Sequence, residues 1–398
     1  MRTALVLLAA ALTAACASVA PKQAAAPPAH AAHAWATFDS AGIKASGAGG
    51  FADRSAGRAL TIDDPVRIAS ISKLVVALGA MRLVEEGKLD LDEDVSERLG
   101  WKLRNPTFPD RPITLRLLLS HRSSLRDGIN YALPLGSRVE QAVEAPEAWD
   151  GEHPPGTFFR YSNLGFPVVA SVMEKATGER FDRLMERLVL KPLDLDACFN
   201  WTTCTDSAIA RAGVLYAPDG TAVRDDLKGA RPDCPVVPAA DGSCDLSDYR
   251  LGSNGALFSP QGGLRISVRD LAKVGGLLLR QGRLADGTRF LSEASVAEME
   301  SLHWRFDGGN GDSEGGFYCG YGLAVQILAQ CAPTDDPFGD GRPRLGHAGD
   351  AYGLRSGLWI DRATGRGIAY FATGLGDDPA RGRSAYRAIE EWLAGMSR

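Results

Sequence analysis

Ser70 and Lys73 are the first residues in this sequence whose types and spacing could do chemistry. They stand in RIASISK, residues 67–73, where an apolar run predicts the start of a helix. A helix N-terminus favours negative charge that develops on a serine oxygen or a nearby oxyanion. A lysine buried in such a helix has a lowered pKa, so it can accept the serine proton. The alternative is a serine that caps the helix and a lysine whose ammonium reaches solvent.

Tyr161 and Asn163 form a second candidate pair, in the segment PGTFFRYSNLG. A phenol near a cation can act first as a base and then as an acid. The asparagine amide could hold Lys73 in place and bond a substrate carbonyl. The alternative is a structural tyrosine in a turn, with Asn163 as the N-cap of the next helix.

His347 and Gly349 lie in RLGHAGDAYGLRSG, just before the C-terminal strands. A glycine there would let a substrate backbone lie close to a strand edge. The alternative is a glycine-rich turn with a partly buried histidine.

The elements that must position these residues follow from periodicity and from turn signals. Strands are expected at both chain ends, and helices between them. The helices are expected over residues 70–87, 113–125, 163–178, 181–193, 267–282 and 384–395, and the clearest strands over 354–361 and 368–374. This order predicts an α+β fold whose antiparallel sheet is built from both chain ends and flanked by helices, with a mostly helical second lobe.

Composition limits the classes of partner. The chain has 398 residues, a net charge of −5 and no run of lysine or arginine, so no nucleic-acid partner is expected. No apolar stretch long enough to span a membrane follows the N-terminus.

The N-terminus predicts export. Residues 1–16 have a basic residue, a short apolar run and small residues, which is typical of a signal peptide. The small residues before Cys16 resemble a lipobox, in which the cysteine is lipidated and anchors the chain to a membrane, although Thr13 stands where leucine is usual. Residues 17–35 read as an Ala/Pro-rich linker, in which His30 and His33 would lack the rigid geometry for a metal. Residues 36–398 are expected to form one catalytic domain.

Six cysteines follow Cys16, and an even number in an exported chain predicts disulfides. Short loops favour Cys198 with Cys204, and Cys234 with Cys244. Cys319 and Cys331 flank a segment that reads as a strand, and a straight strand of that length would hold them too far apart to bond. Either that segment bends or these two cysteines pair differently.

The motifs S-x-x-K, Y-x-N and [KH]-x-G, in this order and at this separation, resemble the serine β-lactamase and penicillin-recognising superfamily. The most similar branch contains class C β-lactamases, DD-peptidases, D-aminopeptidases and family VIII carboxylesterases. The flanking segments ITLRLLLSHRSSL, PQGGLRISVRDLAKVG and GYGLAVQIL also match in order, over nearly all of residues 40–375. The resemblance implies the β-lactamase/transpeptidase-like fold.

The resemblance also implies roles for the matching residues. Ser70 would be the acylated nucleophile, Lys73 its proton partner and Tyr161 the general base and acid. The substrate and its oxyanion would be bound by Asn163, His347, Gly349 and the backbone N–H groups of Ser70 and Asp350. By the same resemblance, Gly262, Gly263 and His121 would be structural.

One departure concerns carboxylate recognition. HAG replaces the KTG that many members have, so Ala348 lacks a hydroxyl and His347 is mostly neutral near pH 7. Arg355 is the candidate to replace the missing charge.

The sequence therefore predicts a periplasmic or cell-envelope serine hydrolase without cofactor or metal, acting on a small ester, amide, D-amino-acid peptide or β-lactam. One alternative is a true β-lactamase or DD-carboxypeptidase. Another is a non-catalytic penicillin-binding or sensor domain.

Overall fold

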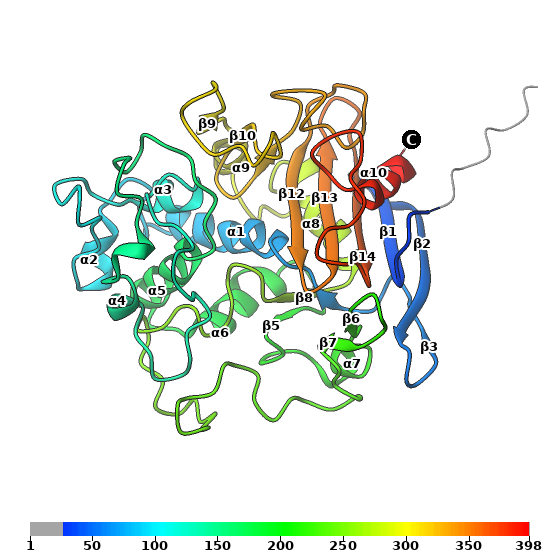
Figure 1. The fold of residues 1–398 in the computed structure, drawn as a ribbon, viewed down its shortest axis with the longest axis horizontal. Helices are drawn as coiled ribbons and strands as arrows, with labels where there is room; N and C mark the ends of the chain where they lie inside the picture. The colour runs from blue at the N-terminus through cyan, green and yellow to red at the C-terminus, as the bar shows by residue number, and fades with distance from the viewer. Residues whose placement is uncertain (1–26, 398) are drawn as a thin grey trace, which may run out of the picture.

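A large antiparallel sheet forms the centre of the computed structural model, which describes residues 27–397 (Figure 1). Its strands are β1 (Ala32–Asp39), β2 (Gly42–Asp53), β3 (Arg58–Ala59), β9 (Trp304–Arg305), β10 (Gly320–Tyr321), β11 (Gln326–Ile327), β12 (Leu345–Ala351), β13 (Leu354–Asp361) and β14 (Arg366–Thr373). Their order across the sheet is β3-β2-β1-β14-β13-β12-β11-β10-β9. The predicted fold class is confirmed.

β1 and β14 join the two ends of the described chain. They pair antiparallel, from Ala32 opposite Thr373 to Asp39 opposite Arg366. In Figure 1 the blue β1 lies beside the red β14. The sheet is therefore built from both chain ends, as the order of the elements predicted.

Side chains of the central strands alternate between two buried cores. Leu358 of β13 and Phe371 of β14 pack on the side of α8 (Val268–Leu279). Trp359 of β13 points the other way and packs on the side of α10 (Ala388–Ala394). Each fully buried side chain of this size contributes about 1.5–3 kcal/mol relative to an exposed one, so packing on both faces stabilises the sheet against its helices.

The helical lobe lies to one side of the sheet, and α1 (Ile71–Glu85) runs between the two (Figure 1). α1 packs against β12 and α5, and it is buried almost all round. The other helical segments are α2 (Val95–Leu99), α3 (Leu115–Leu119), α4 (Val139–Ala142), η1 (Pro146–Ala148), α5 (Gly165–Thr177), α6 (Phe181–Met185), η2 (Glu186–Leu190), α7 (Asp206–Ala210), α9 (Glu293–Glu300) and η3 (Gly395–Ser397).

Two small sheets complete the fold. One consists of β4 (Val66–Arg67), β8 (Leu264–Ile266) and β5 (Cys198–Phe199), and its strand β4 directly precedes α1 in the chain. β6 (Leu215–Tyr216) and β7 (Ala222–Arg224) form the other.

The cysteines of the described chain form three disulfides. Two are the predicted pairs, Cys198–Cys204 and Cys234–Cys244. Cys319 bonds Cys331, because the segment between them is not one straight strand. It turns after β10 and returns as β11, with Gly322 N–H donating to the Val325 carbonyl at 2.7 Å, and so the two ends meet.

The boundary of the linker was wrong by a few residues. β1 begins at Ala32, so residues 32–35 belong to the sheet. His30 and His33 are ordered here, with His30 Nε2 and His33 Nδ1 2.7 Å apart. The expected signal peptide, Cys16 and most of the linker lie outside the described residues. Among residues 27–397, no helix has the length and apolar character needed to cross a membrane.

Candidate active site

Ser70 stands at a strained start of α1. Ala69 before it has a φ of 54°, which is the left-handed region that alanine rarely adopts. Ser70 is the N-cap residue, yet its side chain makes no capping hydrogen bond. The hydroxyl is therefore not used as a helix cap, which removes the structural explanation for this serine.

Lys73 is fully buried and its amine touches Ser70. Its Nζ lies 3.1 Å from Ser70 Oγ, 2.7 Å from Asn163 Oδ1 and 2.9 Å from the Gln261 carbonyl. Burial lowers the pKa of Lys73 to about 7, although Asp127 opposes the shift. The lysine does not reach solvent, so the second structural explanation is removed as well.

The partners of Lys73 decide where its lone pair can point when it is neutral. The Asn163 Oδ1 and the Gln261 carbonyl can only accept hydrogen bonds. Ser70 is the one of the three that has a proton to donate. A neutral Lys73 can thus donate to Asn163 and Gln261 while it accepts from Ser70, which is the arrangement that proton transfer from the serine requires.

Asp127 is a site residue that sequence reasoning missed. Its carboxylate accepts from Asn163 Nδ2 at 2.8 Å and from the backbone N–H groups of Asn163 and Leu164 at 2.8 and 2.9 Å. This fixes the Asn163 amide with its oxygen toward Lys73. Asn163 is therefore not the N-cap of α5, a position that Leu164 holds.

Tyr161 lies over Lys73 within an aromatic group. Its ring centroid is 4.7 Å from Lys73 Nζ and 4.8 Å from the stacked ring of Tyr318. Burial raises the pKa of Tyr161 above its usual range, although the nearby hydroxyls of Ser70 and Tyr318 counteract part of this. The buried Tyr161 hydroxyl has no hydrogen-bond partner with good geometry among residues 27–397. The raised pKa of the phenol fits Lys73 as the base that first takes the Ser70 proton and Tyr161 as a proton donor to the leaving group. The expected role of Tyr161 as general base and acid stays a prediction.

His347 is placed differently from the expectation. It is fully buried and does not line the cleft beside Ser70. Its Nδ1 lies 2.5 Å from the Ala348 carbonyl and its Nε2 lies 2.8 Å from the Tyr321 hydroxyl. Burial and, to a smaller extent, the charge of Lys73 lower the pKa of His347 to about 3, although the hydrogen bond with the Ala348 carbonyl opposes the shift. In this structure His347 is a buried support, and the prediction that it contacts substrate is not met.

His121, which was expected to be structural, connects to His347 through hydrogen bonds. The Ser162 N–H donates to His121 Nδ1, so the proton of this neutral ring is on Nε2. His121 Nε2 then donates to the Tyr321 oxygen at 3.2 Å, and the Tyr321 hydroxyl donates to His347. One directed chain of hydrogen bonds therefore ties the loop that holds Tyr161 to β12.

Gly349 is required by the packing of β12 against the segment before Ser70. A Cβ at this position would lie 2.6 Å from the Ile68 carbonyl, too close for any real contact. Ser356 of β13 donates to the same carbonyl at 2.9 Å. β12 is thus held against the segment that leads into Ser70, which brings Asp350 to the same cleft as the serine. The predicted oxyanion role of the Ser70 and Asp350 N–H groups stays a prediction.

The cleft beside Ser70 has a volume of about 1040 Å³. Ser70, Tyr161, Asn163 and Gly349 line it together with residues 224–227 and 234–238 of the segment between Cys198 and Cys244. That segment therefore forms part of the cleft wall. Arg355 also lines the cleft, but its Nη1 is paired with Asp350 at 2.7 Å.

Comparison with known proteins agrees with this architecture. The family model described as Beta-lactamase matches residues 27–391. Esterase EstB of Burkholderia gladioli is 28% identical over 344 residues, which are 80% of each chain. Penicillin-binding protein 4 of Amycolatopsis lactamdurans is 26% identical over 63% of this chain and 60% of its own length.

Among solved structures, D-amino acid amidase from Ochrobactrum anthropi SV3 superposes with a TM-score of 0.66 at 20% identity and covers 92% of both chains. That likeness concerns the fold. The family model extends over most of the chain and includes the Ser70, Tyr161 and His347 segments. The chain therefore belongs to the Beta-lactamase family and is a serine hydrolase of that fold.

Proposed function

We propose that this hydrolase cleaves carboxylic esters through an acyl-enzyme on Ser70. The observation that carries the proposal is the buried Lys73 amine, whose one proton-donating partner among its three neighbours is the Ser70 hydroxyl. A pKa of about 7 leaves about half of Lys73 neutral at pH 7. A non-catalytic binding domain has no need for such an amine.

In the proposed reaction, neutral Lys73 takes the Ser70 proton as Oγ attacks the ester carbonyl. The backbone N–H groups of Ser70 and Asp350 would hold the oxyanion. Tyr161 would give its proton to the leaving alkoxide and regain one from the Lys73 ammonium. A water then attacks the acyl-enzyme by the same transfers in reverse, which releases the acid and restores Ser70.

The residues around β12 favour esters over β-lactams. Ala348 offers no hydroxyl, His347 is neutral and lies below the cleft wall, and Arg355 is already paired with Asp350. A β-lactam carboxylate would thus lack a ready partner at this end of the cleft. The likeness to an esterase over 80% of the chain supports the same choice. The likeness to a penicillin-binding protein keeps β-lactamase or DD-carboxypeptidase activity as the second candidate.

We expect kcat/KM for p-nitrophenyl butyrate to exceed that for a chromogenic cephalosporin. The difference should be roughly 10–100-fold, since a charge-assisted hydrogen bond is typically worth about 1.5–3 kcal/mol. Ala348→Thr adds a hydroxyl to the cleft wall and should raise cephalosporin turnover severalfold. Ala45→Thr, at an exposed position of β2 that does not line the cleft, is the matched control and should not. Efficient cephalosporin turnover by the unmodified protein would replace the esterase proposal with the second candidate. Ester turnover no faster than that of Ser70→Ala would favour the binding domain.

We also propose export to the cell envelope. The signal-like residues 1–16 and the three disulfides support it, because disulfides persist in oxidising compartments. Fractionation of cells that make the full-length chain tests the proposal. Protein found only in the cytoplasm, with its thiols reduced, would contradict it. Lipid labelling that is lost in Cys16→Ser would show an anchor.

A further inference from the structure

Arg67 carries a buried charge without a direct partner, because Asp225, the nearby carboxylate that favours this charge, is already hydrogen-bonded to Arg265. Arg67 lies three residues before Ser70, lines the same cleft and is 9% exposed. No hydrogen bond or ion pair joins its guanidinium to another residue of the described chain, and its Nε is buried without a partner. An unpaired buried charge is costly, so this arginine indicates a partner that comes from outside the protein.

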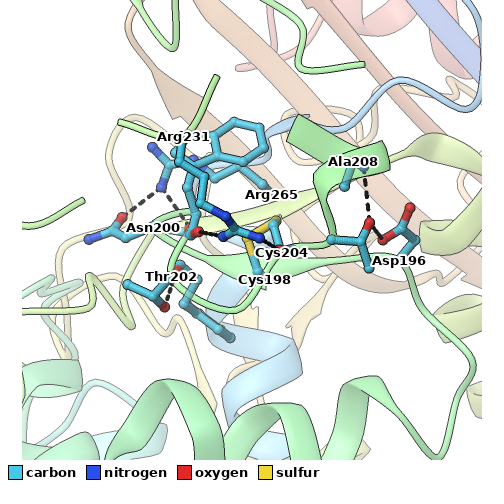
Figure 2. Close-up of a disulfide and its surroundings, with 12 residues drawn as sticks. Asp196, Cys198, Asn200, Thr202, Cys204, Ala208, Arg231 and Arg265 are labelled. Atoms are coloured by element: carbon cyan, nitrogen blue, oxygen red, sulfur yellow. Dashed lines mark hydrogen bonds between the residues drawn. A yellow bond between two sulfur atoms is a disulfide. The ribbon is translucent and has the colours of Figure 1, made fainter. Parts of the chain in front are cut away.

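Arg265, its neighbour across the ladder of β4 and β8, shows the contrast. Arg265 is also buried, with 3% of its surface exposed, but it donates to Asp225 Oδ1 at 2.8 Å and to Asn200 Oδ1 at 2.6 Å. Figure 2 shows Arg265 and Asn200 beside the Cys198–Cys204 disulfide, which fixes this part of the chain. One of two adjacent arginines is thus fully paired by the protein, and the other is left open at the cleft.

Tyr352 and Arg224 extend the site around Arg67. The Arg67 and Arg224 guanidinium carbons lie 5.1 and 4.4 Å from the centroid of the Tyr352 ring. Arg224 Nη2 donates to the Tyr352 hydroxyl at 2.9 Å. Burial alone would raise the pKa of Tyr352, but Arg67 and Arg224 outweigh it and lower the pKa. Two guanidinium groups thus share one aromatic ring at the cleft surface, where the local potential is positive.

The charged groups around Arg67 indicate the charge of the missing partner. Arg67, Arg224 and Arg265 face the cleft with the carboxylates of Asp225 and Asp226. Since Arg265 and Asp225 pair with each other, Arg67 and Arg224 face only Asp226 in this group, which leaves room for one carboxylate. Guanidinium forks bind carboxylates in two-point geometry.

We propose that Arg67 and Arg224 bind a carboxylate that the substrate carries in addition to its scissile ester. The site lies beyond the C-terminal end of β12, where Tyr352 follows the strand, and not at the uncharged His347 and Ala348 end. The inference rests on the proposed function for its substrate class, while the binding site itself needs no turnover.

Ligand binding to the full-length Ser70→Ala protein tests the carboxylate site separately from the proposed esterase activity. We expect calorimetry to show that monomethyl adipate, with one carboxylate, binds at least tenfold more tightly than dimethyl adipate, which has none. Arg224→Gln should remove this preference, and so should Arg67→Met. Arg366→Gln, at the exposed start of β14 and away from the cleft, is the matched control and should keep it.

Arg224 is exposed, so its variant should fold even if the buried Arg67 variant does not. Equal affinity for the two esters, or a preference that survives Arg224→Gln, would overturn the proposal. In protein that retains Ser70, the kcat/KM ratio of p-nitrophenyl adipate monoester to p-nitrophenyl hexanoate should fall at least tenfold in Arg224→Gln and should stay the same in Arg366→Gln. Absence of hexanoate turnover alongside intact calorimetric preference would contradict the esterase function and leave the carboxylate site standing.

Discussion

Ser70→Ala is expected to abolish covalent labelling by a fluorophosphonate and to lower kcat/KM for p-nitrophenyl butyrate by roughly 10⁴-fold or more. The reason is the loss of the oxygen that Lys73 Nζ contacts at 3.1 Å. No other hydroxyl bonds that amine among the described residues. Intact-protein mass spectrometry and peptide mapping measure the label, and stopped-flow release of p-nitrophenol measures the rate.

Ser72→Ala is the matched control for that experiment. Ser72 lies in the first turn of the same helix, and its hydroxyl donates to the Ala69 carbonyl at 2.6 Å without touching Lys73. The variant should lose some stability but keep the label on the Ser70 peptide. Labelling that persists in Ser70→Ala would remove Ser70 from the mechanism.

Lys73→Met is expected to slow acylation by on the order of a hundredfold or more. Methionine fills a similar volume but cannot accept the Ser70 proton. We do not expect a comparably large loss of folding stability, because a buried amine with a lowered pKa is itself unfavourable in the folded state. Single-turnover kinetics and thermal unfolding, measured side by side, separate lost chemistry from a damaged fold.

Lys73→Met should also change the pH dependence of kcat/KM. Below pH 7 most of Lys73 is the ammonium and cannot act as the base, so kcat/KM of the unmodified enzyme should fall about tenfold per pH unit. Above pH 7 the amine is neutral and the profile should level off. Lys73→Met should lack the inflection near pH 7. An unchanged inflection in the variant would assign it to another group.

Local patterns of the sequence were enough to predict the centre of the site. The S-x-x-K spacing and the apolar residues after it predicted a buried helix that begins at the serine, and α1 begins at Ile71. Ser267 caps α8 in an equally local way, by accepting from the Asp270 N–H. These features depend on neighbours within one helical turn, which a sequence displays directly.

Contacts between distant segments could not be predicted in this way. The carbonyl that holds Lys73 belongs to Gln261, 188 residues further along the chain, and no side-chain type marks a backbone carbonyl. Asp127 looked like an ordinary loop residue until the fold placed it against Asn163. His347 was expected in the cleft because the resemblance places it where many members have a lysine. Whether such a residue faces the substrate or the core depends on what packs over β12, here Tyr321.

The pairing of β1 with β14 also has a consequence for biosynthesis. Their residues are partners in the sheet but stand at opposite ends of the described chain. At about 5–20 residues per second, a ribosome needs on the order of 20–60 s to make the sequence between them. During that time β1 can pair only with β2, and one of its edges stays open. The central sheet therefore closes only after translation has nearly finished, and a nascent chain truncated before β14 should remain sensitive to protease and prone to aggregation.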